Sequence, residues 1–168
     1  NFTVVRQKYN GIQFRSRLEA RWAVWFDAMG IPYVYEPEGV CLWGGGGVYL
    51  PDYYLPRHHG GVYAEVKPDE FTDEEKKKCR MLCRMAKRTV VLLDGAPEPI
   101  AYPCYAWENN DVREGDIVLH AVCTRTESRF LADLGYTDRR AAFSLATIEA
   151  LESFRAALGA FTGDDSAL

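Results

Sequence analysis

The most regular hydrophobic pattern in the chain covers residues 16–29. Apolar side chains recur there every three or four residues, which places them on one face of a helix; they are Leu18, Trp22, Trp25 and Met29. Ser16 is a typical N-cap residue, and Gly30 followed by Ile31-Pro32 ends a helix because proline cannot continue it. We therefore expect a helix over these residues.

A second helix is predicted from Thr72 to about residue 87. Thr72 and Glu75 have the spacing of a capping box, in which two side chains satisfy free backbone N–H groups at the start of a helix. Short apolar runs at 62–67 and 89–93 flank this helix and have the composition of buried strands. Together the three segments form a βαβ unit, so the two strands should be parallel.

The rest of the pattern predicts further short elements, with no repeat and no linker between them. A turn is expected at Asn10-Gly11, strands at 2–5, 33–36, 48–55, 101–107 and 117–123, and helices at 128–134 and 140–158. We expect one α/β domain over residues 1–168. It would have a core at 1–95 with a mixed central sheet flanked by helices, an α+β extension at 96–161 and a frayed tail at 162–168.

The strands at 48–55 and 62–67 are expected to form a hairpin, and its register has a chemical consequence. If Leu55 and Val62 close the loop, Asp52 lies directly opposite Glu65, with Cβ atoms ~4.5–5.5 Å apart on one face. Two carboxylates this close repel each other unless a positive charge lies between them.

Composition fits a globular protein, since 48% of the 168 residues are hydrophobic. No stretch approaches the ~20 apolar residues that span a membrane and no signal peptide opens the chain, so we expect a cytoplasmic protein without a membrane partner. Five cysteines without a CxxC motif indicate reduced thiols. Cys79 and Cys83 have the spacing to share a metal, but two small buried thiols are favoured, and His58-His59 are expected in a solvated loop.

Charge is unevenly distributed along the chain. The net charge of −4 argues mildly against a nucleic-acid-binding protein, yet residues 76–88 hold seven basic groups and no acidic one. A phosphate-binding patch and an ordinary exposed helix face both explain this segment.

The candidate chemistry lies in Asp52, Glu65 and Lys67. A hard divalent cation such as Mg²⁺ would sit between the two carboxylates, because it prefers oxygen ligands. Lys67 follows Glu65 by two residues on the same strand face and would supply a positive charge beside an attacked phosphate. The alternative is a surface hairpin on which Glu65 and Lys67 merely form an ion pair, worth ~0–1 kcal/mol.

The stretch from Tyr9 to Pro68 resembles the PD-(D/E)XK nuclease superfamily, which has a restriction-endonuclease-like αβββαβ core. The resemblance rests on three segments in this order: FRSRLEARW with Glu19, LPDYYL with Pro51-Asp52, and YAEVK with Glu65-Val66-Lys67. It is closest to small endonucleases of phages, bacteria or transposons, and it does not extend beyond Asp94. The Gln-x-x-x-Tyr motif of the RecB-like branch is missing after the third segment.

The resemblance implies a Mg²⁺-dependent nuclease, with Mn²⁺ able to substitute, that hydrolyses DNA through a metal-activated water. Asp52, Glu65 and the backbone carbonyl of Val66 would bind the metal, Lys67 would act on the nucleophile, and Glu19 would hold a metal or a water. Glu19 has an alternative role in a capping box with Ser16. Other candidates for an extra acid are Glu36 and Glu38.

Several basic and aromatic side chains are candidates for contacts with nucleic acid. Phosphate contacts are expected from Tyr9, Arg15, Arg17, Arg21, Lys76, Lys77, Arg80 and Arg84. Trp43 and Tyr49 have the chemistry to stack on bases, although packing within the protein is favoured. Two alternatives to a stand-alone nuclease remain: a non-catalytic module on a nuclease fold that binds DNA or protein, and a nuclease subunit of a larger phage, mobile-element or defence complex. A homodimer and a larger complex are both candidate assemblies.

Overall fold

The computed structural model describes residues 7–42, 44, 47–58, 60–98 and 100–119 of the chain. Several sequence predictions fall outside this part and stay predictions: the strand at 2–5, both helices after residue 128, the tail, and most of the extension at 96–161. In the part that is described, no helix is long and apolar enough to cross a membrane.

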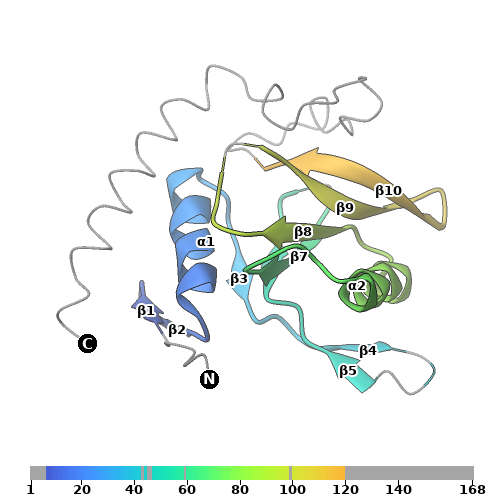
Figure 1. Ribbon diagram of the computed structural model, residues 1–168, viewed down its shortest axis with the longest axis horizontal. Coiled ribbons are helices and arrows are strands. Elements are labelled where there is room, and N and C mark those ends of the chain that lie inside the picture. The colour runs from blue at the N-terminus through green and yellow to red at the C-terminus, as the bar shows by residue number, and fades with distance from the viewer. Residues whose placement is uncertain (1–6, 43, 45–46, 59, 99, 120–168) are drawn as a thin grey trace.

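A mixed sheet of six strands forms the centre of the fold (Figure 1). Its strands, in spatial order, are β10 (Asp111–Val118), β9 (Ala101–Glu108), β8 (Val90–Asp94), β7 (Val62–Lys67), β6 (Tyr53–Leu55) and β3 (Val34–Tyr35). Only β7 and β8 run parallel to each other, and the other neighbours in this sheet are antiparallel. The predicted α/β class with a mixed central sheet is therefore confirmed.

Two helices lie on opposite sides of this sheet (Figure 1). Helix α1 (Arg17–Ala28) begins after Ser16, whose hydroxyl accepts a hydrogen bond from the Glu19 N–H at 3.1 Å. Helix α2 (Asp73–Ala86) begins after Thr72 with both hydrogen bonds of the predicted capping box. Both helices match the sequence prediction closely, because their caps and periodicity are local properties of the chain.

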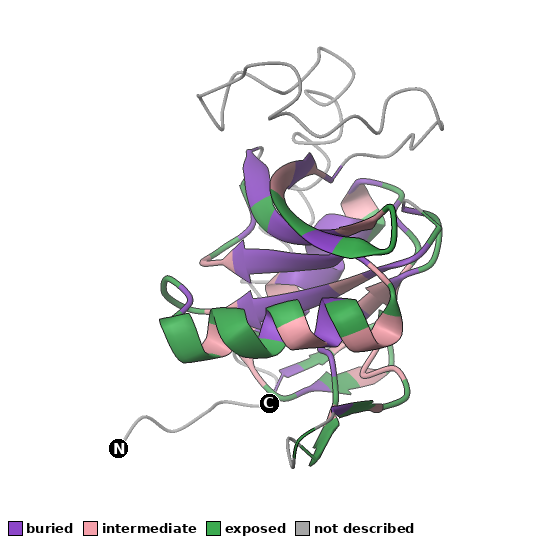
Figure 2. Cartoon of the chain, turned by 90° about the vertical axis from the view of Figure 1, so that its right-hand side faces the viewer, coloured by how far each residue is buried: buried purple, intermediate pink, exposed green. Residues whose placement is uncertain are grey.

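The sheet separates two apolar cores. On the α1 side, Trp22, Trp25 and Phe26 pack against Tyr53 and further inward-facing residues of the sheet. On the α2 side lie Phe71, Cys79, Leu82, Cys83, Val90, Leu92, Tyr105 and Val112. In Figure 2, where α2 is nearest the viewer, its outer face is exposed and the strands behind it are largely buried. A strand with both faces covered in this way holds its side chains in defined positions.

The βαβ unit is formed by β7, α2 and β8, and its strands are parallel as predicted. Its central strand β7 lies between β6 and β8, so it is hydrogen-bonded on both edges. Glu65 and Lys67 are thus carried by an inner strand, the most rigidly held part of such a sheet.

The prediction of a single strand over residues 48–55 is wrong. Strand β5 (Gly47–Tyr49) instead pairs with β4 (Val40–Leu42) in a separate two-stranded sheet, and β6 begins only at Tyr53. Pro51 lies between the two strands and has no N–H for a ladder hydrogen bond, which explains the break. The bend places Asp52 one residue before β6, where its carbonyl accepts a hydrogen bond from the Glu36 N–H at 2.8 Å.

Two asparagine turns connect further hairpins. Asn10-Gly11, with positive φ at both residues, joins β1 (Gln7–Tyr9) to β2 (Ile12–Phe14), as predicted for a turn. Asn109-Asn110 also has positive φ at both residues and joins β9 to β10. The strand predicted at 117–123 therefore begins six residues earlier, at Asp111; residues 120–123 lie outside the described part. Asparagine tolerates this backbone conformation, a signal that the prediction overlooked.

Cys79 and Cys83 are fully buried in the α2 core, as favoured from the sequence. Burial raises the pKa of each thiol to about 12, so both remain protonated at neutral pH. His58, expected in a solvated loop, is instead buried, and that expectation is wrong. The turn between β6 and β7 folds the residue inward: the His58 N–H donates to the Leu55 carbonyl and the Gly61 N–H donates to the His58 carbonyl.

Candidate functional site

The hairpin of β6 and β7 has the register predicted from the sequence. Leu55 pairs with Val62, Tyr54 with Tyr63, and Tyr53 with Ala64. Asp52, one residue before β6, therefore reaches the Glu65–Val66 segment of β7, and the Val66 N–H donates to Asp52 Oδ2 at 2.8 Å. Asp52 is 4% exposed and Glu65 6% exposed, so two carboxylates are buried side by side.

Glu65 is the less satisfied of the two acids. Its Oε1 lies 3.9 Å from Lys67 Nζ, whereas its buried Oε2 has no hydrogen-bond partner. Burial and then the charge of Asp52 raise the pKa of Glu65 to about 7, and the nearby Tyr49 hydroxyl and the charge of Lys67 oppose this rise. A buried carboxylate oxygen without a donor is costly, and a bound cation would remove that cost.

Asp52 is better compensated. Its Oδ2 accepts from Val66 and its Oδ1 from Arg15 Nη2. Burial nevertheless raises the pKa of Asp52 to about 6; the charge of Glu19 adds to the rise, and Val66, Arg15 and Lys67 oppose it. Both acids of the pair are thus less acidic than in water, as expected for two carboxylates that lack a cation between them.

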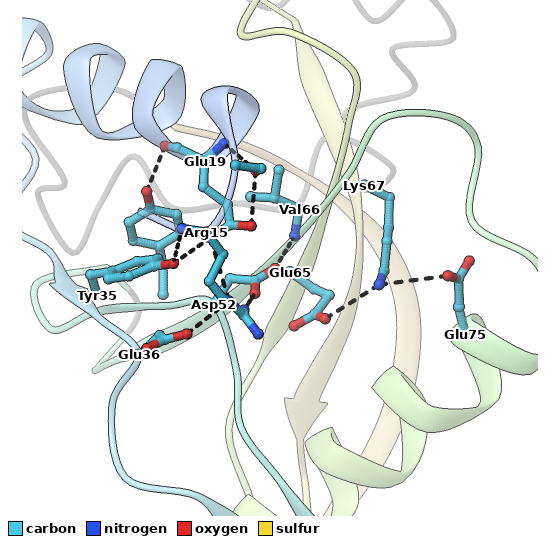
Figure 3. A network of polar contacts seen from close by, with 11 residues as sticks. Arg15, Glu19, Tyr35, Glu36, Asp52, Glu65, Val66, Lys67 and Glu75 are labelled. Atoms are coloured by element: carbon cyan, nitrogen blue, oxygen red, sulfur yellow. Dashed lines mark hydrogen bonds and ion pairs between the residues drawn. The ribbon is translucent and has the colours of Figure 1, made fainter. Parts of the chain in front are cut away.

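Lys67 closes the site on the side of α2. Its ammonium group lies between Glu65 and Glu75, 3.6 Å from Glu75 Oε1 (Figure 3). Glu75 is the acid of the α2 capping box, so the start of this helix helps to position the Lys67 ammonium group. About a third of the Lys67 side chain is exposed, which leaves its ammonium group accessible from solvent.

Glu19 faces the same site from the first turn of α1. Its Oε1 accepts from the Ser16 hydroxyl at 2.9 Å, and its Oε2 accepts from the Tyr35 hydroxyl. Arg15 Nε lies 3.7 Å from the same Oε2. Glu19 therefore contacts the Ser16 hydroxyl, in place of the Ser16 N–H contact of a capping box, and its role toward a metal or a water stays a prediction.

Arg15 joins the elements of the site. Its guanidinium group contacts Asp52 and lies 2.8 Å from Glu36 Oε1 (Figure 3). Glu36, an alternative acid in the sequence prediction, is therefore an anchor for Arg15. The Arg15 side chain remains half exposed.

The four predicted catalytic residues line one pocket of about 500 Å³. Its walls come from both helix starts and from β5, β7 and the segments between; the lining residues are Arg15, Glu19, Tyr49, Leu50, Asp52, Glu65, Val66, Lys67, Glu75 and Lys78. A larger hollow of about 710 Å³ lies between α2 and β9–β10 and contains none of these acids. We favour the smaller pocket as the site because it is lined by Glu65, whose buried Oε2 has no hydrogen-bond partner.

The other predicted phosphate contacts are not gathered at this pocket. Tyr9 donates to Asp27 Oδ2 at 2.7 Å, at the far end of α1. Arg80 and Arg84 form ion pairs with Glu114 and Asp111 of β10. The remaining four candidates do not line the pocket; they are Arg17, Arg21, Lys76 and Lys77. Arg15 is thus the candidate phosphate contact that the fold brings to the acids.

Three pocket residues were not predicted as part of a site: Leu50, Glu75 and Lys78. Tyr35, which donates to Glu19 beside the pocket, was not predicted either. Tyr49 was considered only for base stacking. Nothing in the sequence around these pocket residues marks them as functional. They reach the pocket because the β4–β5 sheet and α2 pack around β7.

The donor set suits a cation that retains water ligands. Among the described residues, no three His, Cys, Asp or Glu side chains converge as a ready metal site. Asp52 and Glu65 would therefore be the two side-chain ligands, and the Val66 carbonyl remains a predicted third. Mg²⁺ is commonly held by one or two carboxylates with several waters, so the residues fit this ion.

The raised pKa values predict how stability depends on pH. A carboxyl group whose pKa is higher in the folded than in the unfolded state stabilises the fold below its unfolded pKa, and this contribution disappears as pH rises through the folded value. For Asp52 and Glu65 the loss should extend from about pH 4 to about pH 7. In EDTA, the melting temperature should therefore fall on going from about pH 5.5 to about pH 8.

Mg²⁺ should reduce this fall, because the ion binds the folded, deprotonated site. The matched variant Glu65→Gln should show a smaller fall in EDTA, since glutamine does not titrate. Thermal unfolding followed by circular dichroism measures both effects. An equal fall in Glu65→Gln and in the unmodified protein would contradict the assignment of this pH dependence to the acid pair.

Neither known family models nor curated proteins provide a match to this sequence.

Proposed function

We propose that this chain is a metal-dependent nuclease that hydrolyses phosphodiester bonds in DNA, most simply as an endonuclease. The observation that carries the proposal is the meeting of Asp52, Glu65 and Lys67 in one pocket, where a buried oxygen of Glu65 has no hydrogen-bond donor. A purely structural ion-pair network is expected to satisfy its buried oxygens.

The order of elements supports the proposal. Helix α1, strands β3, β6 and β7, helix α2 and strand β8 follow one another along the chain, with the β4–β5 hairpin inserted after β3. This is the αβββαβ order expected of a PD-(D/E)XK nuclease. In that arrangement Asp52 precedes the second strand and Glu65 and Lys67 lie on the third.

Each residue has a defined part in the proposed reaction. Asp52 and Glu65 would hold Mg²⁺ or Mn²⁺, which when bound would favour deprotonation of a water and offset charge on the phosphate. Lys67 reaches the same space, since its Nζ is 3.9 Å from Glu65 Oε1. Its positive charge can stabilise a negative charge that develops on the attacking oxygen or the phosphate. Glu19 orients Arg15 and Tyr35 through its Oε2.

The positive groups of the pocket favour a phosphate-containing substrate. Arg15, Lys67 and Lys78 come from three different segments and all line the pocket. Although the chain as a whole carries a charge of −4, these groups attract phosphate locally.

Cleavage assays on purified protein test the proposal directly. Plasmid, linear duplex, single-stranded and branched DNA, with RNA counterparts, are incubated with Mg²⁺, Mn²⁺ or EDTA. We expect cleavage of at least one DNA substrate with either ion and none in EDTA. Glu65→Gln, purified in the same way, should not cleave and so controls for a contaminating nuclease. A folded, unmodified protein that cleaves no substrate would contradict the proposal.

A non-catalytic nucleic-acid-binding module is the second candidate. It is favoured by one observation: both oxygens of Asp52 already accept hydrogen bonds from within the protein. A module of this kind would retain DNA in a mobility-shift assay, with or without a divalent ion, and would leave it intact.

A further inference from the structure

Arg15 occupies one of the positions that a bound ion would need. Its Nη2 donates to Asp52 Oδ1, while Asp52 Oδ2 is taken by the Val66 N–H. Both oxygens of Asp52 are therefore taken by protein donors, whereas the buried Glu65 Oε2 has no hydrogen-bond partner. An ion shared by the two acids would lie within a few ångströms of the guanidinium group and would be repelled by it.

The surroundings of Arg15 allow its guanidinium group to move. Half of its side chain is exposed, so little desolvated contact is lost when it turns outward. Glu36, itself a third exposed, holds the Nε at 2.8 Å and lies away from Glu65 (Figure 3). The Arg15 backbone is independently held, because its N–H donates to the Tyr35 hydroxyl at 3.0 Å. Release from Asp52 thus requires side-chain rotation and leaves the backbone in place.

We propose that Arg15 is an exchangeable cation: it neutralises Asp52 before an ion binds, and passes to a phosphate of the substrate when the ion takes its place. This inference rests on the proposed function, since it needs both a divalent ion and a phosphate. Arg15 is suited to the second role because a guanidinium group matches the geometry of phosphate oxygens and stays charged at any working pH.

The exchange couples two binding events. In the absence of nucleic acid, the ion has to displace Arg15 and binds less tightly than the acids alone would allow. Once the ion is bound, Arg15 is available to phosphate, so the ion strengthens nucleic-acid binding. By linkage, nucleic acid strengthens ion binding by the same factor.

Replacement of Arg15 by glutamine tests the first half of the exchange. Calorimetric titration with Mn²⁺ alone, without nucleic acid, should show about tenfold tighter binding for Arg15→Gln, as expected when one positive charge near a divalent ion is removed. Arg113→Gln is the matched control, because Arg113 is an exposed arginine of β10 outside the pocket, and its affinity should equal that of the unmodified protein. Arg15→Lys keeps the charge and should bind Mn²⁺ less tightly than Arg15→Gln.

Fluorescence anisotropy with a labelled oligonucleotide tests the second half. In a Lys67→Ala background, which is meant to keep the DNA intact, Mg²⁺ should strengthen binding, and the additional change Arg15→Gln should abolish this strengthening. An unchanged or weaker Mn²⁺ affinity in Arg15→Gln overturns the exchange while the proposed function stands. If the unmodified protein binds no Mn²⁺, the proposed metal site is excluded, and both proposals are overturned.

Discussion

Replacement of Lys67 by alanine is expected to slow single-turnover DNA cleavage by at least about 100-fold, the cost typical of losing one group that stabilises charge in the transition state. The ammonium group lies beside Glu65 and is accessible from the pocket, so no other described lysine duplicates its contacts. The fold should be unaffected, because the side chain is a third exposed and its ion pairs are weak.

Binding of Mn²⁺ to Lys67→Ala should be retained and slightly strengthened, because a positive neighbour of the acids is lost. Lys8→Ala, at an exposed position of β1 outside the pocket, removes the same charge and should cleave at the unmodified rate. Quenched-flow or manual single-turnover assays with enzyme in excess give the rates. A Lys67→Ala protein that cleaves at the unmodified rate would exclude Lys67 from the chemistry.

Replacement of Asp52 by asparagine is expected to weaken Mg²⁺ and Mn²⁺ binding by roughly 30-fold or more. Loss of one negative charge ~4 Å from a divalent ion in a water-like medium costs about 2 kcal/mol of binding free energy. Asparagine retains an oxygen that can accept the hydrogen bond from Val66, so the bend before β6 should persist. Cleavage at low Mg²⁺ should fall at least as strongly as ion binding.

Asp69→Asn is the control for this variant, because Asp69 is an exposed acid in the loop between β7 and α2. Calorimetric titration with Mn²⁺ measures the affinities, and thermal unfolding in EDTA confirms that both variants fold. Equal affinity in Asp52→Asn and the unmodified protein would remove Asp52 from the proposed ion site. The two variants also separate the parts of the site, since Lys67→Ala should slow cleavage without weakening ion binding, whereas Asp52→Asn should weaken ion binding.

Features that depend on neighbouring residues in the chain were predictable. Ser16 and Thr72 start the two helices through hydrogen bonds to residues three positions later. The register of the β6–β7 hairpin follows from its short loop and from side-chain alternation, and it determines that Asp52 reaches Glu65–Val66. Local geometry was therefore enough to predict that the two acids would be neighbours.

Features that depend on packing across long stretches of chain were not predictable. Pro51 divides the strand expected at 48–55. Only the fold shows that the residues before and after Pro51 belong to two different sheets. Arg15 and Tyr9 were both expected to contact phosphate. Only Arg15 lies at the acids, while Tyr9 is bound to Asp27 at the other end of α1.

The sequence by itself thus determined the two helices, the hairpin register and the place of Asp52 beside the Glu65–Val66 segment, because caps, turns and strand alternation act over a few residues. The tertiary structure alone decided that Arg15, in the segment before α1, contacts Asp52 and Glu19 and that Glu75 of α2 holds Lys67. Those contacts join side chains from separate elements, and their positions depend on how two helices pack on opposite faces of one sheet.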